Sequence, residues 1–163
     1  MSVSANAISA CNPEGLILDE YLPYRLSISS NAVSRLISRA YEDRFGLTIP
    51  QWRLMAVLAE EPMTQQAIVA RTAMDKVTVS RAAQGLVTRH LVGRAAHEVD
   101  GRSHILALTE QGHALHAQIA PLALAYEAAL LSGLTPVEVA MLKRLLMRLE
   151  TAAGQLSGEV VLG

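Results

Sequence analysis

The organisation of this chain follows from residues 63–92, MTQQAIVARTAMDKVTVSRAAQGLVTRHLV. The pattern indicates a short helix, a tight turn and a second helix. Thr64 can cap the free N–H groups at the start of the first helix, and Asp75 can do the same for the second. Thr72 and Ala73 interrupt the periodicity between them. We therefore predict a helix-turn-helix.

The second helix, from Asp75 to His90, has two contrasting sides at about 100° per residue. One side has the spacing of a buried face and carries Val79, Ala82, Ala83, Leu86 and His90. The other side offers a guanidinium, an amide, hydroxyls and a small apolar group, which are groups that read base edges in a DNA major groove. Its candidate DNA-binding residues are Lys76, Val77, Thr78, Ser80, Arg81 and Gln84. An ordinary amphipathic helix with a solvated face would show the same pattern.

The segment after this helix favours the DNA-binding interpretation. Two short, partly β-branched runs, Val92–Val99 and Ser103–Leu108, are separated by Asp100, Gly101 and Arg102. Asp-Gly between such runs indicates a hairpin, since glycine tolerates the positive φ of a tight turn. A helix-turn-helix followed by a basic hairpin is a winged helix, which we assign to residues 49–108.

The flanking segments are mostly helical. We expect a loose N-terminal arm over residues 1–17 and a long helix from Asp19 to about Phe45, with Pro23 in its first turn and Gly46 at its end. The next helix starts near Pro50. We expect it to bury Trp52, Met55, Ala56 and Leu58.

Two further helices close the chain, from Thr109 to about Ser132 and from Thr135 to about Leu156. Thr135, Pro136 and Glu138 form a capping box with proline at the first helical position. Both helices are more apolar than a surface helix requires, and a chain of this size cannot bury them alone. We therefore expect a homodimer, with residues 18–48 and 109–158 as its helical dimerisation region.

The composition fits a mainly α fold with a small β-hairpin wing. Apolar residues make up 51% of the chain and aromatic residues only 4%, and abundant Ala and Leu favour helices. The net charge is −1, yet residues 71–104 hold six basic side chains against three acidic ones. Such a local basic segment indicates contact with nucleic acid. With no secretory signal or membrane-spanning stretch, we expect a cytoplasmic protein.

Three segments resemble the MarR family of transcriptional regulators: FGLTIPQWRLMAVL (45–58), TQQAIVARTAMDKVTVSRAAQGLVTRHLVGR (64–94) and EVDGRSHILALTEQG (98–112). The resemblance implies a homodimer whose two winged helices bind a pseudo-palindromic operator in double-stranded DNA. It maps the recognition helix onto residues 75–90 and the wing arginine onto Arg102, which would enter the minor groove. Arg94 would order the wing through Asp100.

The resemblance also implies a small-molecule effector, and a repressor that this effector releases from DNA. An aromatic acid or its CoA thioester would require a cation and apolar walls. Candidate effector-binding residues are Tyr21, Tyr24, Arg25, Trp52 and Arg53. An equal alternative is that Arg25 pairs with an acidic side chain at the dimer interface. Nothing in the sequence separates the free acid from the thioester.

Other functions have weaker support. Glu110, His113 and His116 have a spacing that could bind zinc, so a metal-responsive regulator is the alternative, although we assign no metal site and no cofactor. Redox sensing through Cys11 has weaker support, because Cys11 precedes the first helix, whereas peroxide-sensing relatives carry their cysteine inside it. No catalytic motif is present, so we expect no enzyme. A winged helix that binds only protein remains open.

Overall fold

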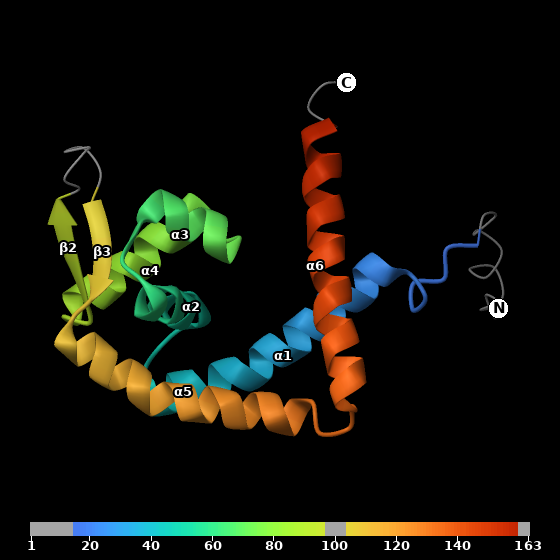
Figure 1. Cartoon of the computed structure of the whole chain (residues 1–163), viewed down its shortest axis with the longest axis horizontal. Helices are drawn as coiled ribbons and strands as arrows, with labels where there is room; N and C mark the ends of the chain where they lie inside the picture. Colours follow the sequence, from blue (N-terminus) through green and yellow to red (C-terminus); the bar gives the residue numbers. More distant parts are fainter. Residues whose placement is uncertain (1–14, 97–103, 160–163) are drawn as a thin grey trace, which may run out of the picture. The chain divides into compact units, whose positions relative to one another are not determined.

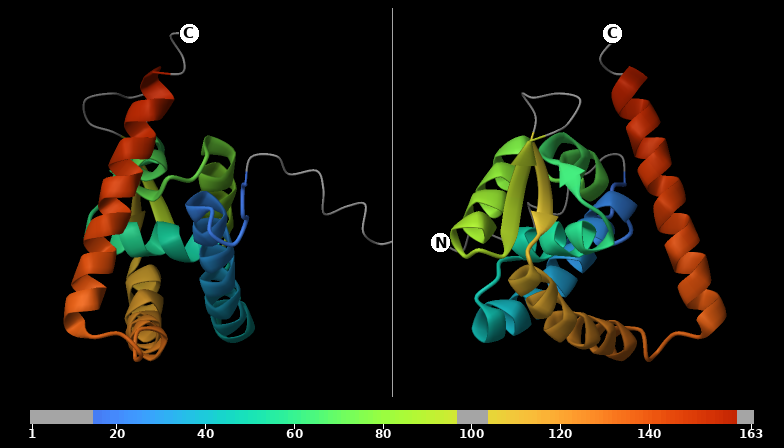
Figure 2. Two further views of the ribbon diagram at one scale, coloured as in Figure 1. Left: turned by 90° about the vertical axis from the view of Figure 1, so that its right-hand side faces the viewer. Right: turned by 60° about the vertical axis from the view of Figure 1, so that its left-hand side comes forward.

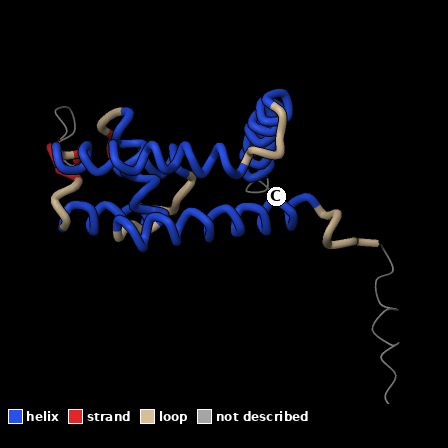
Figure 3. The backbone as a smooth tube through the Cα atoms, turned by 90° about the horizontal axis from the view of Figure 1, so that it is seen from below, coloured by secondary structure: helices blue, strands red, loops and turns tan. Residues whose placement is uncertain are grey.

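The computed structural model describes residues 15–96 and 104–159. The chain divides into two compact units, Met1–His113 and Ala114–Gly163. Helices predominate, with one small antiparallel sheet (Figures 1 and 3), which confirms the predicted fold class. The elements are α1 (Leu22–Phe45), α2 (Ile49–Glu60), β1 (Met63–Thr64), α3 (Gln65–Thr72), α4 (Lys76–Thr88), β2 (Val92–Ala96), β3 (His104–Leu108), α5 (Glu110–Leu130) and α6 (Pro136–Glu159).

Local capping side chains start α3 and α6 where the sequence predicts, whereas α1 begins at Leu22 rather than at the expected Asp19 and has no side-chain cap. The Thr64 hydroxyl accepts a hydrogen bond from the backbone N–H of Ala67 at the start of α3. The capping box of α6 is also confirmed, because the Thr135 N–H donates to the Glu138 carboxylate at 2.7 Å. A second capping box, formed by Thr48 and Gln51, starts α2.

Left-handed residues end two of the helices in the first unit. Gly46, with φ of 61°, follows α1 as predicted. Ala73 adopts φ of 53° after α3, which turns the chain into α4. The prediction that His90 lies on the buried face of α4 is wrong. The helix ends at Thr88, and His90 is an exposed residue with φ of 57° that turns the chain toward β2.

The core of the first unit forms where α4 packs on α2 and α3 (Figure 2). Val79, Ala82, Ala83 and Leu86 are buried, as the periodicity of α4 predicts. On α2, Met55 and Leu58 are buried as expected, but Trp52 and Ala56 are only half-buried. Leu54, which is absent from the core expected for this helix, is fully buried.

The sheet has the order β1-β3-β2, and all its pairs are antiparallel. The strand pairing of the predicted hairpin is confirmed, with Val92 opposite Leu108 and Ala96 opposite His104, while its expected turn at Asp100 and Gly101 lies outside the described residues. The short strand β1 was not expected. It pairs Met63 with Leu106, so the chain between α2 and α3 is fixed against the hairpin.

The start of α5 lies against the start of the hairpin. The Thr109 hydroxyl donates to the His90 carbonyl oxygen at 2.7 Å and accepts from the Gly112 N–H at 3.0 Å. A Cβ atom on residue 112 would come within 2.0 Å of the Leu91 carbonyl oxygen. Glycine is therefore required here, because the obstacle is backbone rather than a flexible side chain.

The second unit holds most of α5 and all of α6. Lys143 of α6 forms an ion pair with Glu127 of α5, with an N–O distance of 3.0 Å. Many large apolar side chains of this unit are exposed: Leu124, Leu130, Leu134, Val137, Met141, Leu142, Leu145, Leu146, Met147, Leu149 and Leu156. Within residues 15–96 and 104–159, no helix has the length and hydropathy needed to cross a bilayer.

Candidate nucleic-acid interface

The outward side of α4 carries the side chains that the sequence assigns to DNA contact. Lys76, Val77, Ser80, Arg81 and Gln84 are exposed, while Thr78 is half-buried. Val77 is 58% exposed although it is apolar. The inward side is fixed by the core, so the helix can turn only this mixed polar surface outward.

The first turn of α4 is organised by one carboxylate. Asp75 accepts from the Thr78 hydroxyl at 2.6 Å and from the Thr78 backbone N–H at 2.8 Å. These two hydrogen bonds, the hydroxyl contributing most, lower the pKa of the Asp75 carboxyl. The positive end of the helix dipole is therefore already matched by a fixed negative charge. The Thr78 hydroxyl is also engaged within the chain, which sequence reasoning did not anticipate.

Three of the basic side chains in residues 71–104 make contacts within the chain. Arg71 pairs with Glu60 of α2. Arg89 donates to the carbonyl oxygens of Gly46 and Phe45, at 2.8 and 3.0 Å, and so caps the end of α1. Arg94 donates to Gln84. Lys76 and Arg81, by contrast, make no hydrogen bond or ion pair with any residue that the structure describes.

Arg94 connects the hairpin to α4. Its Nη2 donates to Oε1 of Gln84 at 3.0 Å. Two other predicted sites, Asp100 and Arg102, lie outside the described residues, as does the expected pairing of Arg94 with Asp100. The contact between Arg94 and Gln84 joins a strand to a helix. The periodicity of residues within one element therefore could not predict it.

The candidate effector residues form two groups within one chain. The Trp52 ring lies 5.2 Å from the ring of Tyr41, centroid to centroid. Tyr24 lies in the first turn of the helix that carries Tyr41, about 25 Å away along its axis at 1.5 Å per residue. Tyr21 and Arg25 accompany Tyr24 and are exposed. One chain does not bring them to Trp52 and its neighbour Arg53.

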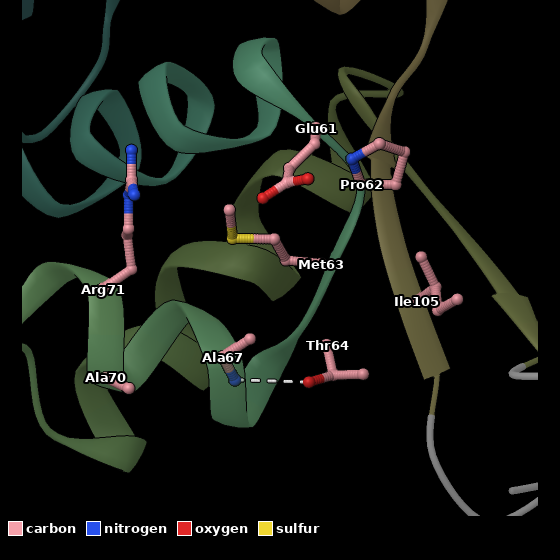
Figure 4. A pocket seen from close by; sticks show the side chains of 8 residues that line it. All are labelled: Glu61, Pro62, Met63, Thr64, Ala67, Ala70, Arg71 and Ile105. Atoms are coloured by element: carbon pink, nitrogen blue, oxygen red, sulfur yellow. Dashed lines mark hydrogen bonds between the residues drawn. The ribbon is translucent and has the colours of Figure 1, made fainter.

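A surface groove of about 610 Å³ lies between α3 and Ile105 of β3 (Figure 4). The side chain of Arg71 stands at its border, where it pairs with Glu60. Most of the exposed lining is apolar. The groove is lined by Glu61, Pro62, Met63, Thr64, Ala67, Ala70, Arg71 and Ile105.

Glu110, His113 and His116 have the spacing of possible zinc ligands at the start of α5. Among the described residues, no group of three or more His, Cys, Asp or Glu side chains could hold a metal ion. These three residues therefore do not form a complete ligand set in the described part of the chain.

Comparison with known proteins agrees with this architecture. A family model described as MarR family matches residues 45–103, from the end of α1 into the hairpin. The chain is 28% identical over 130 residues to the HTH-type transcriptional regulator MgrA of Staphylococcus aureus, covering 79% of this chain and 87% of MgrA.

Solved structures show the same fold. A MarR/EmrR family transcriptional regulator from Acinetobacter sp. ADP1 superposes with a TM-score of 0.80 at 26% identity, over 86% of this chain and 99% of that protein. BpsR of Bordetella bronchiseptica superposes with a TM-score of 0.73 at 23% identity, over 80% and 99% of the two chains, and shows likeness of fold alone. With its winged helix and these matches, the chain is similar in sequence and fold to DNA-binding transcriptional regulators of the MarR family.

Proposed function

We propose that this chain is a homodimeric repressor that binds a pseudo-palindromic operator and is released by a small aromatic acid or its CoA thioester. The outward surface of α4 is the main support for DNA binding, because the apolar side of this helix is buried in the core and its polar side is exposed. Residues 49–108 would bind DNA, with Arg94 and Asp100 ordering the wing. The DNA contacts would be Lys76, Val77, Thr78, Ser80, Arg81, Gln84 and Arg102.

Exposed apolar surface supports the homodimer. Residues 18–48 and 109–158 would form the dimer interface, since both regions expose large aliphatic side chains that a monomer would rarely leave in water. In α1 these are Leu22, Leu26, Ile28 and Leu36. In α6, Leu142, Leu145 and Leu149 recur on one side of the helix and are all exposed. A two-fold axis would bury both sets against their copies.

The effector proposal rests on residue chemistry and on fold relatives. The DNA binding of BpsR is regulated by 6-hydroxynicotinic acid, and PcaV of Streptomyces coelicolor has been solved with its natural ligand. Here Arg25 and Arg53 are exposed cations close in sequence to aromatic rings. Because the two groups lie apart in one chain, a site that uses both would be completed by α1 of the partner.

The DNA contact of Arg81 can be tested with a duplex selected by the wild-type protein from a random library. Arg81→Ala should weaken binding by about tenfold or more, since a guanidinium contact to a base edge contributes ~1–3 kcal/mol. Arg71→Ala removes the same charge from a side chain that pairs with Glu60 and should have a much smaller effect. Affinities are measured by fluorescence anisotropy. Equal losses of affinity in the two variants would contradict a specific contact of Arg81 and indicate general electrostatic attraction.

The dimer interface can be tested by sedimentation equilibrium. Leu145→Glu should dissociate the dimer, because a carboxylate in an apolar helix interface must be desolvated. Gln155→Glu places the same charge at an exposed polar position of α6 and should leave the dimer intact. A monomeric wild type, or a Leu145→Glu variant as dimeric as the wild type, contradicts the proposed interface.

The effector class can be tested by a thermal-shift screen of hydroxylated benzoic and nicotinic acids and their CoA thioesters. A ligand of the native state raises the unfolding temperature with its concentration. We expect at least one compound to do so, and expect Arg25→Ala to lose the shift. If no compound of either class stabilises the wild type, the aromatic effector is wrong; an unchanged shift in Arg25→Ala removes that residue from the site.

A further inference from the structure

We propose that Arg94 is a positioning residue that fixes the side-chain amide of Gln84, and so determines which base atoms the recognition helix reads at one position of each half-site. This inference rests on the proposed DNA contact of α4. It assigns Arg94 a role in sequence specificity beyond the ordering of the wing.

The hairpin aims Arg94 at α4. Arg94 stands opposite Leu106 in the antiparallel pair of β2 and β3, and paired residues point to the same face of a sheet. Leu106 and Val92, which share this face, are buried. Arg94 lies farther along the strand and is exposed, so its guanidinium reaches past the core to the outer side of α4, where it donates to Gln84.

The chemistry of this contact sets the direction of the amide. A guanidinium has five N–H donors and no acceptor, so only the oxygen of the Gln84 amide can face it. The NH2 group must then lie on the other arm of the planar amide. A glutamine without such a partner can rotate by half a turn and exchange its donor and acceptor, but Gln84 loses this freedom through the 3.0 Å hydrogen bond from Arg94.

The fixed amide favours base atoms that accept hydrogen bonds. Bidentate reading of adenine by glutamine needs the amide oxygen to accept from the adenine amino group while the NH2 donates to N7. The positive charge of Arg94 beside that oxygen opposes the approach of a second donor. The NH2 of Gln84 instead matches an acceptor, O6 or N7 of guanine or O4 of thymine.

The experiment is sequence selection from a random duplex library by the full-length dimer, with quantification of every base at every position. Gln84→Met, which keeps the length of the side chain without its amide, identifies the position that Gln84 reads. At that position the wild type should select guanine or thymine. Arg94→Ala should raise the preference for adenine on the order of tenfold, equivalent to ~1.4 kcal/mol.

Three further variants separate this role from a general loss of charge or fold. Arg71→Ala, the charge-matched control, should leave the base preference unchanged. Arg94→Lys keeps a donor and a positive charge and should retain much of the wild-type preference. In a Gln84→Met background, Arg94→Ala should change no further base preference, because two residues that act through one contact are not additive. Thermal unfolding confirms that each variant is folded.

The inference is overturned if Arg94→Ala keeps the wild-type preference at the position identified by Gln84→Met. It is also overturned if Gln84→Met alters no position, or if the wild type selects adenine there. A wild type that enriches no sequence at all would refute the proposed operator binding itself, which is a separate result.

Discussion

The burial of one side of α4 against α2 is the constraint on which the interface depends. Val79, Ala83 and Leu86 are fully buried in this contact region, so the helix cannot rotate about its axis without exposing apolar surface. The same packing turns Val77, Arg81 and Gln84 outward. Core packing alone therefore orients the polar side of α4 outward. Hydrogen bonds from the hairpin and within the helix cap then determine which polar atoms on that side remain available to a ligand.

The basic residues show how local charge is divided between structure and binding. Arg89 joins the end of α4 to the end of α1, and Arg94 joins the hairpin to α4. If α1 forms the dimer interface as proposed, Arg89 links that interface to the recognition helix through the carbonyl oxygens of Phe45 and Gly46. Lys76 and Arg81 make no such internal contacts with described residues, so their charges are available for the proposed contacts with DNA.

Much of this fold could be predicted because its signals are local. Thr64, Asp75 and Thr135 cap their helices through hydrogen bonds within three residues, and the 3.6-residue period identifies the buried side of α4. Features that depend on tertiary contacts could not be predicted in this way. The strand β1 exists only through its pairing with β3, His90 leaves the helical pattern where the chain turns toward β2, and the hydrogen bond between Arg94 and Gln84 joins residues on different elements.

The central claim is that two copies of α4, held by a symmetric dimer, bind two half-sites on one face of DNA. The most direct test is the affinity of the wild type for its selected operator after the half-sites are moved apart by about five base pairs, half a helical turn. This insertion places the second half-site on the opposite face of the duplex, so the account predicts that most of the affinity is lost. Unchanged affinity would show that one winged helix binds alone, and would contradict binding of both half-sites by a symmetric dimer.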